Sequence, residues 1–224
     1  MSKPQRFLPG EWYHCYNRGI DMRQVFMEHK DYLRFQMLLY TCNNRMSLSM
    51  RSVRSEDAEF EAVFEQLRDE CLVDIGAYAL MPTHYDLLLR ERVEGGISLF
   101  MRKLGTAYIM YFNAKYRRAG TLFSGRFKSR HVGKATPLKR VVNYIHGNPS
   151  QLFQECRKSD VHRNIVAYPF TSLHDYEDVK RAEGSILSSA LLEEVLTDSP
   201  SMDDVLEDFN TLYARSNKKL WVTS

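Results

Sequence analysis

The sequence predicts an α+β fold, in which an antiparallel sheet is packed with helices and followed by a C-terminal helical extension. Segments with the two-residue alternation of strands are interspersed with segments whose apolar residues recur at helical spacing. Two strand candidates are separated only by a short break at Pro82 and Thr83, and so short a connection joins antiparallel neighbours. The 224 residues are enough for one domain with an appendage, or for two small domains.

The N-terminal part is expected to form a strand and then a helix. Residues 11–19, EWYHCYNRG, indicate a strand that closes in an Asn-Arg-Gly turn. Residues 31–43, DYLRFQMLLYTCN, carry apolar side chains at helical spacing. A polar insert at about residues 44–70 is expected to hold a loop and then a helix from about residue 56 to 70.

The middle of the chain is expected to form a strand pair and a long helix. Residues 71–82, CLVDIGAYALMP, and 84–91, HYDLLLRE, are the two strands. Residues 95–118 have the periodicity of a helix. The side chains expected to face its core are Phe100, Leu104, Tyr108, Tyr111 and Phe112.

A further strand and helix complete the predicted domain. Residues 119–133, AGTLFSGRFKSRHVG, indicate a glycine-punctuated hairpin or strand. Residues 137–149, PLKRVVNYIHGNP, indicate a helix with Thr136 as N-cap and Pro137 in its first turn, stopped by Gly147.

The order strand, helix, strand, strand, helix, strand, helix is that of a ferredoxin-like domain. We place this domain at residues 1–175, with the insert at about 44–70. Residues 176–224 are expected to form an acidic tail of one or two helices, joined by a serine-rich linker. Many unrelated functions use this fold, so the fold alone does not define one.

Positive charge is concentrated in one segment. Residues 95–154 contain no Asp or Glu and eleven basic residues, so this segment carries +11 while the chain as a whole carries +3 and the remaining residues −8. Such segregation is typical of a surface that binds a polyanion. The alternative is a solvated basic face that the acidic tail balances. Membrane association is disfavoured, because no strongly amphipathic basic helix is evident.

The remaining composition favours a cytoplasmic protein without a membrane anchor. The four cysteines are far apart and form no C-x-x-C pair, which suits a reducing compartment and argues against a zinc module. The N-terminal residues lack an apolar signal segment, and no apolar run is long enough to span a bilayer.

One strand candidate carries two polar side chains that need an explanation. In MPTHYDLLLR, His84 and Asp86 are two residues apart and therefore lie on the same face of a strand. An imidazole and a carboxylate side by side can be half of a metal site. They can equally be an ordinary buried hydrogen-bonded pair, and the spacing alone leaves both readings open.

Several motifs resemble a known family. YHCYNRGIDMRQVF is similar to the first strand and turn of the REP-associated tyrosine transposases, which are single-tyrosine HUH transposases related to insertion-sequence transposases. YALMPTHYDLLL resembles the family's Met-Pro-Asn-His-x-His-Leu-Leu, and AGTLFSGRFKSR and NYIHGNPSQ resemble its Arg-Phe-Lys-Ser and Tyr-Ile-x-x-Asn-Pro signatures. The resemblance covers about residues 12–176. One position departs from it, because Asp86 stands where the family has the second histidine of its His-hydrophobic-His motif.

The resemblance implies a site and a reaction. Carried over position by position, Tyr144 is the nucleophile, and His84, Asp86 and Asn148 are the metal ligands. Family members cleave and rejoin single-stranded or hairpin DNA through a 5′-phosphotyrosine intermediate. Aspartate is a good ligand for hard cations, so the departure at position 86 favours Mg²⁺ or Mn²⁺ and does not by itself remove the site.

The basic segment supplies the candidate DNA contacts. Arg126, Lys128 and Arg130 alternate along a predicted strand and can follow a phosphate track. The full set of candidates is Arg117, Arg118, Arg126, Lys128, Arg130, Lys139 and Arg140.

Three functions remain open from the sequence. The first is a tyrosine transposase or single-stranded DNA endonuclease that acts as monomer or homodimer. The second is a non-catalytic descendant that binds hairpin DNA. The third is a protein-interaction module whose acidic tail folds over its basic segment.

Overall fold

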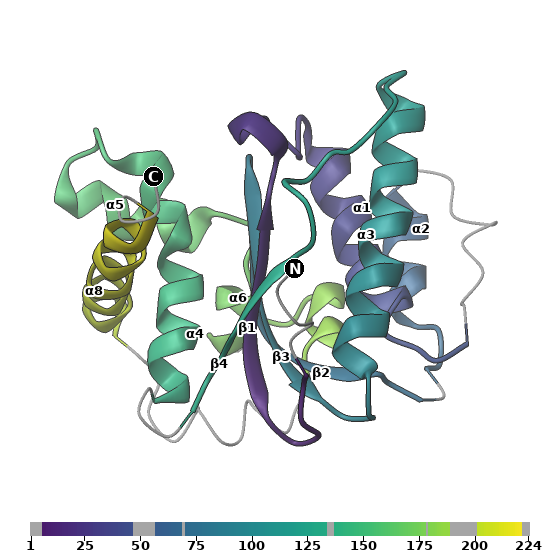
Figure 1. The fold of residues 1–224 in the computed structure, drawn as a ribbon. Helices are drawn as coiled ribbons and strands as arrows, with labels where there is room; N and C mark the ends of the chain where they lie inside the picture. Colours follow the sequence, from purple (N-terminus) through teal and green to yellow (C-terminus); the bar gives the residue numbers. More distant parts are fainter. Residues whose placement is uncertain are drawn as a thin grey trace.

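A four-stranded antiparallel sheet stands between two layers of helices (Figure 1). The computed structural model describes residues 6–46, 57–68, 70–133, 137–177, 179–188 and 201–220. The strands are β1 Trp12–Arg18, β2 Val73–Met81, β3 His84–Glu91 and β4 Lys128–His131. The α-helices are α1 His29–Thr41, α2 Asp57–Phe64, α3 Gly96–Lys115, α4 Leu138–Gly147, α5 Lys158–Ala167, α6 Leu173–Tyr176 and α8 Met202–Leu220. The 3-10 helices are η1 Ile20–Met22, η2 Asn148–Phe153 and η3 Ala182–Ile186.

The strand order is β2-β3-β1-β4, which is the order of a ferredoxin-like sheet. The predicted succession of strands and helices is confirmed, including the tight connection between β2 and β3. Since β1 lies between β3 and β4, it is hydrogen-bonded on both sides and brings their side chains onto common faces.

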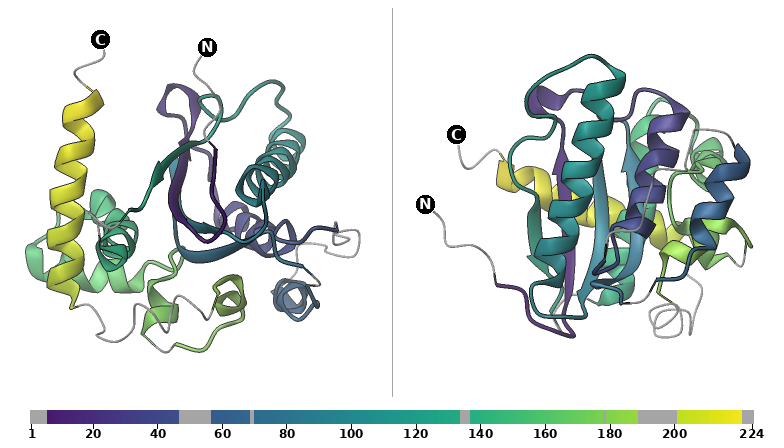
Figure 2. Two further views of the ribbon diagram at one scale, coloured as in Figure 1. Left: turned by 60° about the horizontal axis from the view of Figure 1, so that its bottom comes forward. Right: turned by 90° about the vertical axis from the view of Figure 1, so that its right-hand side faces the viewer.

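The two faces of the sheet are covered differently. Helices α1 and α3 cover one face, and α4 covers the other with α8 packed outside it (Figures 1 and 2). The first face holds an aromatic cluster, in which the ring of Phe35 lies 5.1 Å from that of Tyr85 and 4.9 Å from that of Tyr108. All three side chains are buried, and each contributes roughly 1.5–3 kcal/mol of burial free energy. Burial of this cluster therefore stabilises the packing of α1 and α3 on the sheet.

Three local predictions need correction. The helix expected at about residues 56–70 ends at Phe64. The strand expected within residues 119–133 is short and begins at Lys128, so Arg126 lies in the bend before it. Pro137, which was expected in the first turn of α4, is the N-cap of this helix. Thr136, the expected N-cap, lies outside the described residues.

Helix α4 also carries a histidine that is entirely buried. His146 is 0% exposed, its Nε2 lies 2.8 Å from Ser172 Oγ, and its ring packs edge-on against Tyr176. Burial, followed by repulsion from Arg181 and His174, lowers the pKa of His146 to about 3. The folded protein therefore holds this imidazole in its neutral form at moderately acidic pH.

This histidine predicts a loss of stability in mild acid. Because the pKa of His146 is lower in the folded than in the unfolded chain, the unfolded chain takes up the proton first as the pH falls below about 6.5. The free energy of unfolding should then decrease by about 1.4 kcal/mol per pH unit until the pH nears the folded value. Urea unfolding at pH 7 and pH 4.5 measures this decrease. A His146→Gln variant should lack this contribution, and equal decreases in both proteins would contradict the assignment.

Candidate active site

The sheet register gathers the polar side chains of three strands on the face beneath α4. In β1 and β3, Tyr16 is paired with Asp86 and Arg18 with His84. In β1 and β4, His14 is paired with Arg130. Paired residues of neighbouring strands point to the same side, so two histidines, a carboxylate and basic side chains share this face.

The three predicted metal ligands come together. His84 Nε2 lies 3.3 Å from Asn148 Oδ1 and 3.7 Å from Asp86 Oδ2. His84 and Asp86 come from β3, whereas Asn148 follows the last residue of α4. The end of the helix thus meets the start of the strand, and residues more than sixty positions apart in sequence form one polar cluster.

Asn148 is oriented by the helix that it ends. Its Nδ2 donates to the carbonyl oxygens of Tyr144 and Ile145, each at 3.3 Å. The amide oxygen is therefore left to face His84, and it also accepts a hydrogen bond of 2.8 Å from Gln151. Because Asn148 is buried, this orientation is fixed by the backbone of α4.

The donor set fits a hard divalent cation. Mg²⁺ holds its ligands at about 2.1 Å in an octahedron, so neighbouring ligand atoms lie roughly 3 Å apart. The separations of 3.3 and 3.7 Å around His84 Nε2 are close to this value. No group of three or more His, Cys, Asp and Glu side chains able to hold a metal occurs among the described residues, so a cation held here would have to take the amide oxygen of Asn148 as its third protein ligand.

Asp86 also needs positive charge. The carboxylate is buried, and within the described parts of the chain its ion pairs are both with histidines, His14 and His84. A buried carboxylate is costly unless it is paired, and a histidine is charged only when it holds two protons. A divalent ion at this position would offset that cost.

Tyr144 lies on α4 one turn before Asn148 and is half-buried. Its ring packs edge-on against His14, with centroids 5.6 Å apart, and stacks on Phe209 at the same distance. Burial, followed by the negative charge of Asp86, raises the pKa of Tyr144 well above its usual range, although Arg130 opposes the shift. The raised pKa keeps the Tyr144 phenol protonated. Positive charge near Asp86 would offset the charge of this carboxylate and so reduce the rise in the pKa of Tyr144.

His14 is the contact that sequence reasoning missed. Its Nε2 lies 2.6 Å from Asp86 Oδ1, across 72 positions of sequence. The residue occupies an ordinary strand position in WYHCYNR, and only the pairing of β1 with β3 gives it a partner. A predicted register between these strands would have been the signal that identifies it.

A second feature is the position of the acidic C-terminal helix. Helix α8 lies against α4 (Figure 2), where it buries Val205 and Phe209. Asp208 accepts hydrogen bonds from Arg140 Nε at 2.6 Å and from Asn143 Nδ2 at 2.9 Å. Part of the acidic tail thus packs on the basic segment and covers one side of the Tyr144 ring.

The predicted DNA-binding residues occupy three places. Lys128 and Arg130 are exposed on β4, on the same face as His14 and Tyr144, and Arg126 is exposed just before them. Arg140 is paired with α8, and Lys139 beside it on α4 is half-buried. Arg117 and Arg118 lie beyond the end of α3 in the other helical layer, where Arg118 rests on the ring of Phe112. Of the seven, Lys128 and Arg130 are the two whose strand register places them on the same sheet face as His84 and Asp86, beneath α4.

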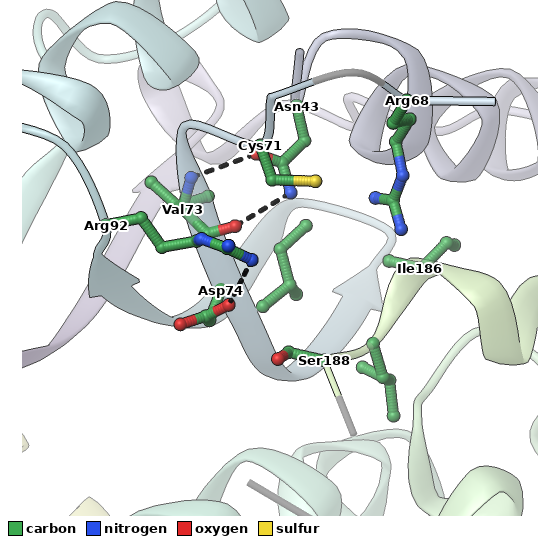
Figure 3. Close-up of a pocket in the computed structure, with 10 residues that line it drawn as sticks. Asn43, Arg68, Cys71, Val73, Asp74, Arg92, Ile186 and Ser188 are labelled. Atoms are coloured by element: carbon green, nitrogen blue, oxygen red, sulfur yellow. Dashed lines mark hydrogen bonds and ion pairs between the residues drawn. The ribbon is translucent and has the colours of Figure 1, made fainter. Parts of the chain in front are cut away.

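Figure 3 shows a separate hollow of about 190 Å³ that is lined by Val73 and Asp74. These residues begin β2, whereas His84 is paired with Met81 at its other end. The charged side chains that line the hollow form ion pairs, hydrogen bonds or ring contacts within the protein. Asp74 is paired with Arg92 at 3.3 Å, and Arg68 donates to the Ser185 carbonyl and lies over the ring of Tyr40. Arg68 thus links the insert to η3 and α1, and none of the residues that line the hollow belongs to the polar cluster.

The fold and the polar cluster define an α+β protein with a tyrosine beside a potential cation site. The family model described as "Transposase IS200 like" matches residues 32–148, which is more than half of the chain. The chain therefore belongs to the IS200-like transposase family.

Other comparisons are more distant. A solved structure described as "Structure of the REP associates tyrosine transposase bound to a REP hairpin" is 15% identical in sequence, with a TM-score of 0.49, over 82% of this chain and 90% of that one. Among curated proteins none matches the sequence. No helix in the described parts of the chain is long and apolar enough to cross a membrane.

Proposed function

We propose that this protein is a metal-dependent DNA-processing enzyme that cleaves and rejoins single-stranded or hairpin DNA. One observation carries the proposal: in a chain of the IS200-like family, His84, Asp86 and Asn148 converge at the end of the helix that bears Tyr144. Tyr144 is the proposed nucleophile, and the three converging side chains are the proposed ligands of Mg²⁺ or Mn²⁺.

The cleavage step is a transesterification that conserves its bonds. The Tyr144 oxygen forms a bond with the scissile phosphorus, and the bond from phosphorus to the 3′ oxygen breaks. The phenolic proton is lost and the departing oxygen gains one, which gives a 5′-phosphotyrosine and a free 3′ hydroxyl. Attack by a 3′ hydroxyl reverses these changes and rejoins the strand, so no water is consumed.

Each side chain has a distinct part in this step. An ion held by His84, Asp86 and Asn148 would supply Lewis acidity to the phosphate and offset the charge that grows in the transition state. Asn148 links the ligand set to the nucleophile, because its amide bonds to the Tyr144 carbonyl. Burial and then the Asp86 charge raise the pKa of Tyr144, and Arg130 opposes this rise and so helps the phenolic proton to leave.

The test is covalent capture. Hairpin DNA labelled on the strand 3′ to the cleavage point is incubated with the protein and Mn²⁺, and the mixture is run on a denaturing gel. A labelled band at the size of the protein plus DNA is expected, and it should be absent when chelator replaces Mn²⁺. Hairpin binding without any such band would overturn the enzymatic proposal.

A second candidate is a non-catalytic protein that binds hairpin DNA. Two observations favour it: Asp86 stands in the place of the family's second histidine, and Phe209 of α8 stacks on the Tyr144 ring. The basic strand β4 is independent of both, so DNA binding is expected under either candidate.

The basic strand predicts a salt-dependent affinity. Each phosphate contact on a single strand contributes about −0.7 to the slope of log affinity against log salt concentration. Replacing both Lys128 and Arg130 by Ala should therefore flatten the slope by about 1.4, if each contacts one phosphate. Fluorescence anisotropy with a labelled hairpin at several salt concentrations measures it. Lys30→Ala, an exposed lysine on α1 in the opposite layer, is the control and should leave the slope unchanged. A salt-independent complex would contradict the phosphate-binding role.

A further inference from the structure

We infer that His14 is a positioning residue that orients the Asp86 carboxylate toward the proposed cation. This support compensates for the absence of a histidine at position 86. The inference rests on the proposed function, because it concerns the same cation site. It adds a residue from β1, on a strand that precedes the residues matched by the family model.

Position 86 carries a shorter side chain than the histidine it replaces. An aspartate side chain reaches less far toward a cation than a histidine side chain, and rotation about χ2 lets its two oxygens exchange places. The contact of 2.6 Å between His14 Nε2 and Asp86 Oδ1 removes that freedom. It occupies one carboxylate oxygen and leaves Oδ2 on the side of His84. One oxygen is thus held by the protein and the other faces the ligand cluster.

The strand register makes this contact possible. His14 is paired with Leu88, so Asp86 lies diagonally across from it, two residues along β3. Diagonal neighbours are about 7–8 Å apart at the backbone, which a ring side chain can span and a short one cannot. His14 is therefore placed to support a short ligand at position 86.

The imidazole is itself held in place. Its ring stacks on Tyr16, with centroids 5.0 Å apart, and meets the edge of the Tyr144 ring. The residue is buried to 9% exposure. A supporting group whose own position is fixed transmits its orientation to the ligand, and the loss of such support commonly costs about 10- to 100-fold in metal affinity.

The same contacts define the role as positioning rather than ligation. The Nε2 atom of His14 is engaged with Asp86 Oδ1, whereas the atoms that converge with His84 Nε2 are Asp86 Oδ2 and Asn148 Oδ1. Support by His14 also matters less if position 86 is a histidine, because that longer side chain reaches the ion without help.

The experiment measures Mn²⁺ affinity of the DNA-free protein by isothermal titration calorimetry. His14→Phe keeps the ring but not the hydrogen bond, and it should weaken Mn²⁺ binding about 10- to 100-fold. His14→Gln keeps a donor of similar reach and should stay within a few-fold of the wild type. In the Asp86→His background, His14→Phe should change the affinity by less than about threefold, because the supported group is gone.

The outcomes separate this inference from the proposed function. Wild-type binding of Mn²⁺ that His14→Phe leaves unchanged would overturn the positioning role alone. An equal loss in the Asp86→His background would also overturn it, since the effect would then not pass through Asp86. Wild-type protein that binds no Mn²⁺ would overturn both. Melting temperatures in chelator, compared among the variants, show whether each folded before its affinity is interpreted.

Discussion

Tyr144→Phe should abolish the covalent attachment of the protein to hairpin DNA and leave hairpin binding unchanged. The substitution removes one oxygen and keeps the ring, so the packing against His14 and Phe209 is retained. The free energy of unfolding is expected to change by no more than about 1 kcal/mol. Adduct formation, by contrast, should fall below detection, because α4 carries no other hydroxyl group that could attack the phosphorus.

Tyr16→Phe is the matched control for this variant. Tyr16 is a tyrosine of the same sheet face, and its ring also contacts His14, but it lies on β1 rather than on α4. Its loss should reduce adduct formation little. Denaturing gels with labelled hairpin and Mn²⁺ compare the two proteins, and an adduct that persists in Tyr144→Phe would mean that a different residue attacks.

Asp86→Ala should remove the stabilisation that Mn²⁺ gives to the folded protein. A ligand present at one hundred times its dissociation constant stabilises the folded state by about 2.7 kcal/mol, so the melting temperature in excess Mn²⁺ should exceed that in chelator by several degrees for the wild type only. The variant also leaves His14 without its partner, which costs about 1–3 kcal/mol in either condition.

Two further substitutions separate charge from shape at position 86. Asp86→Asn keeps the size of the side chain and one acceptor oxygen for His14 but removes the charge, so it should fold like the wild type and bind Mn²⁺ more weakly. Asp86→His restores the family's pair and should preserve or increase activity with Mn²⁺, which imidazole suits. If Asp86→Ala lowered the melting temperature equally in Mn²⁺ and in chelator, His84 and Asp86 would be a structural pair. That result would contradict the proposed metal site.

The elements that could be predicted are those whose pattern is local. Strand alternation places His84 and Asp86 on one face, and the helical repeat puts Asn148 one turn after Tyr144. Both relations need only the period of one element. The confirmed order of strands and helices has the same origin, because each of the long apolar segments carries its own periodicity.

The parts that could not be predicted depend on contacts between distant segments. His14 meets Asp86 only through the register of β1 with β3. Arg140 forms an ion pair with Asp208, 68 positions away. Its charge is therefore already paired, which the local sequence does not reveal. Arg126 leaves the strand because Gly125, at φ 80°, turns the chain immediately before it.

The packing of α8 on α4 also has an evolutionary consequence. A Cβ atom on Gly147 would lie 2.6 Å from Phe209 Cβ and 3.2 Å from the Val205 carbonyl oxygen, although the φ of −77° at this glycine suits any residue. The demand for glycine therefore comes from the neighbouring helix and not from the backbone. Positions 147 and 209 should accordingly covary among related chains. A residue larger than glycine at position 147 would identify relatives in which no helix equivalent to α8 packs on the tyrosine-bearing helix.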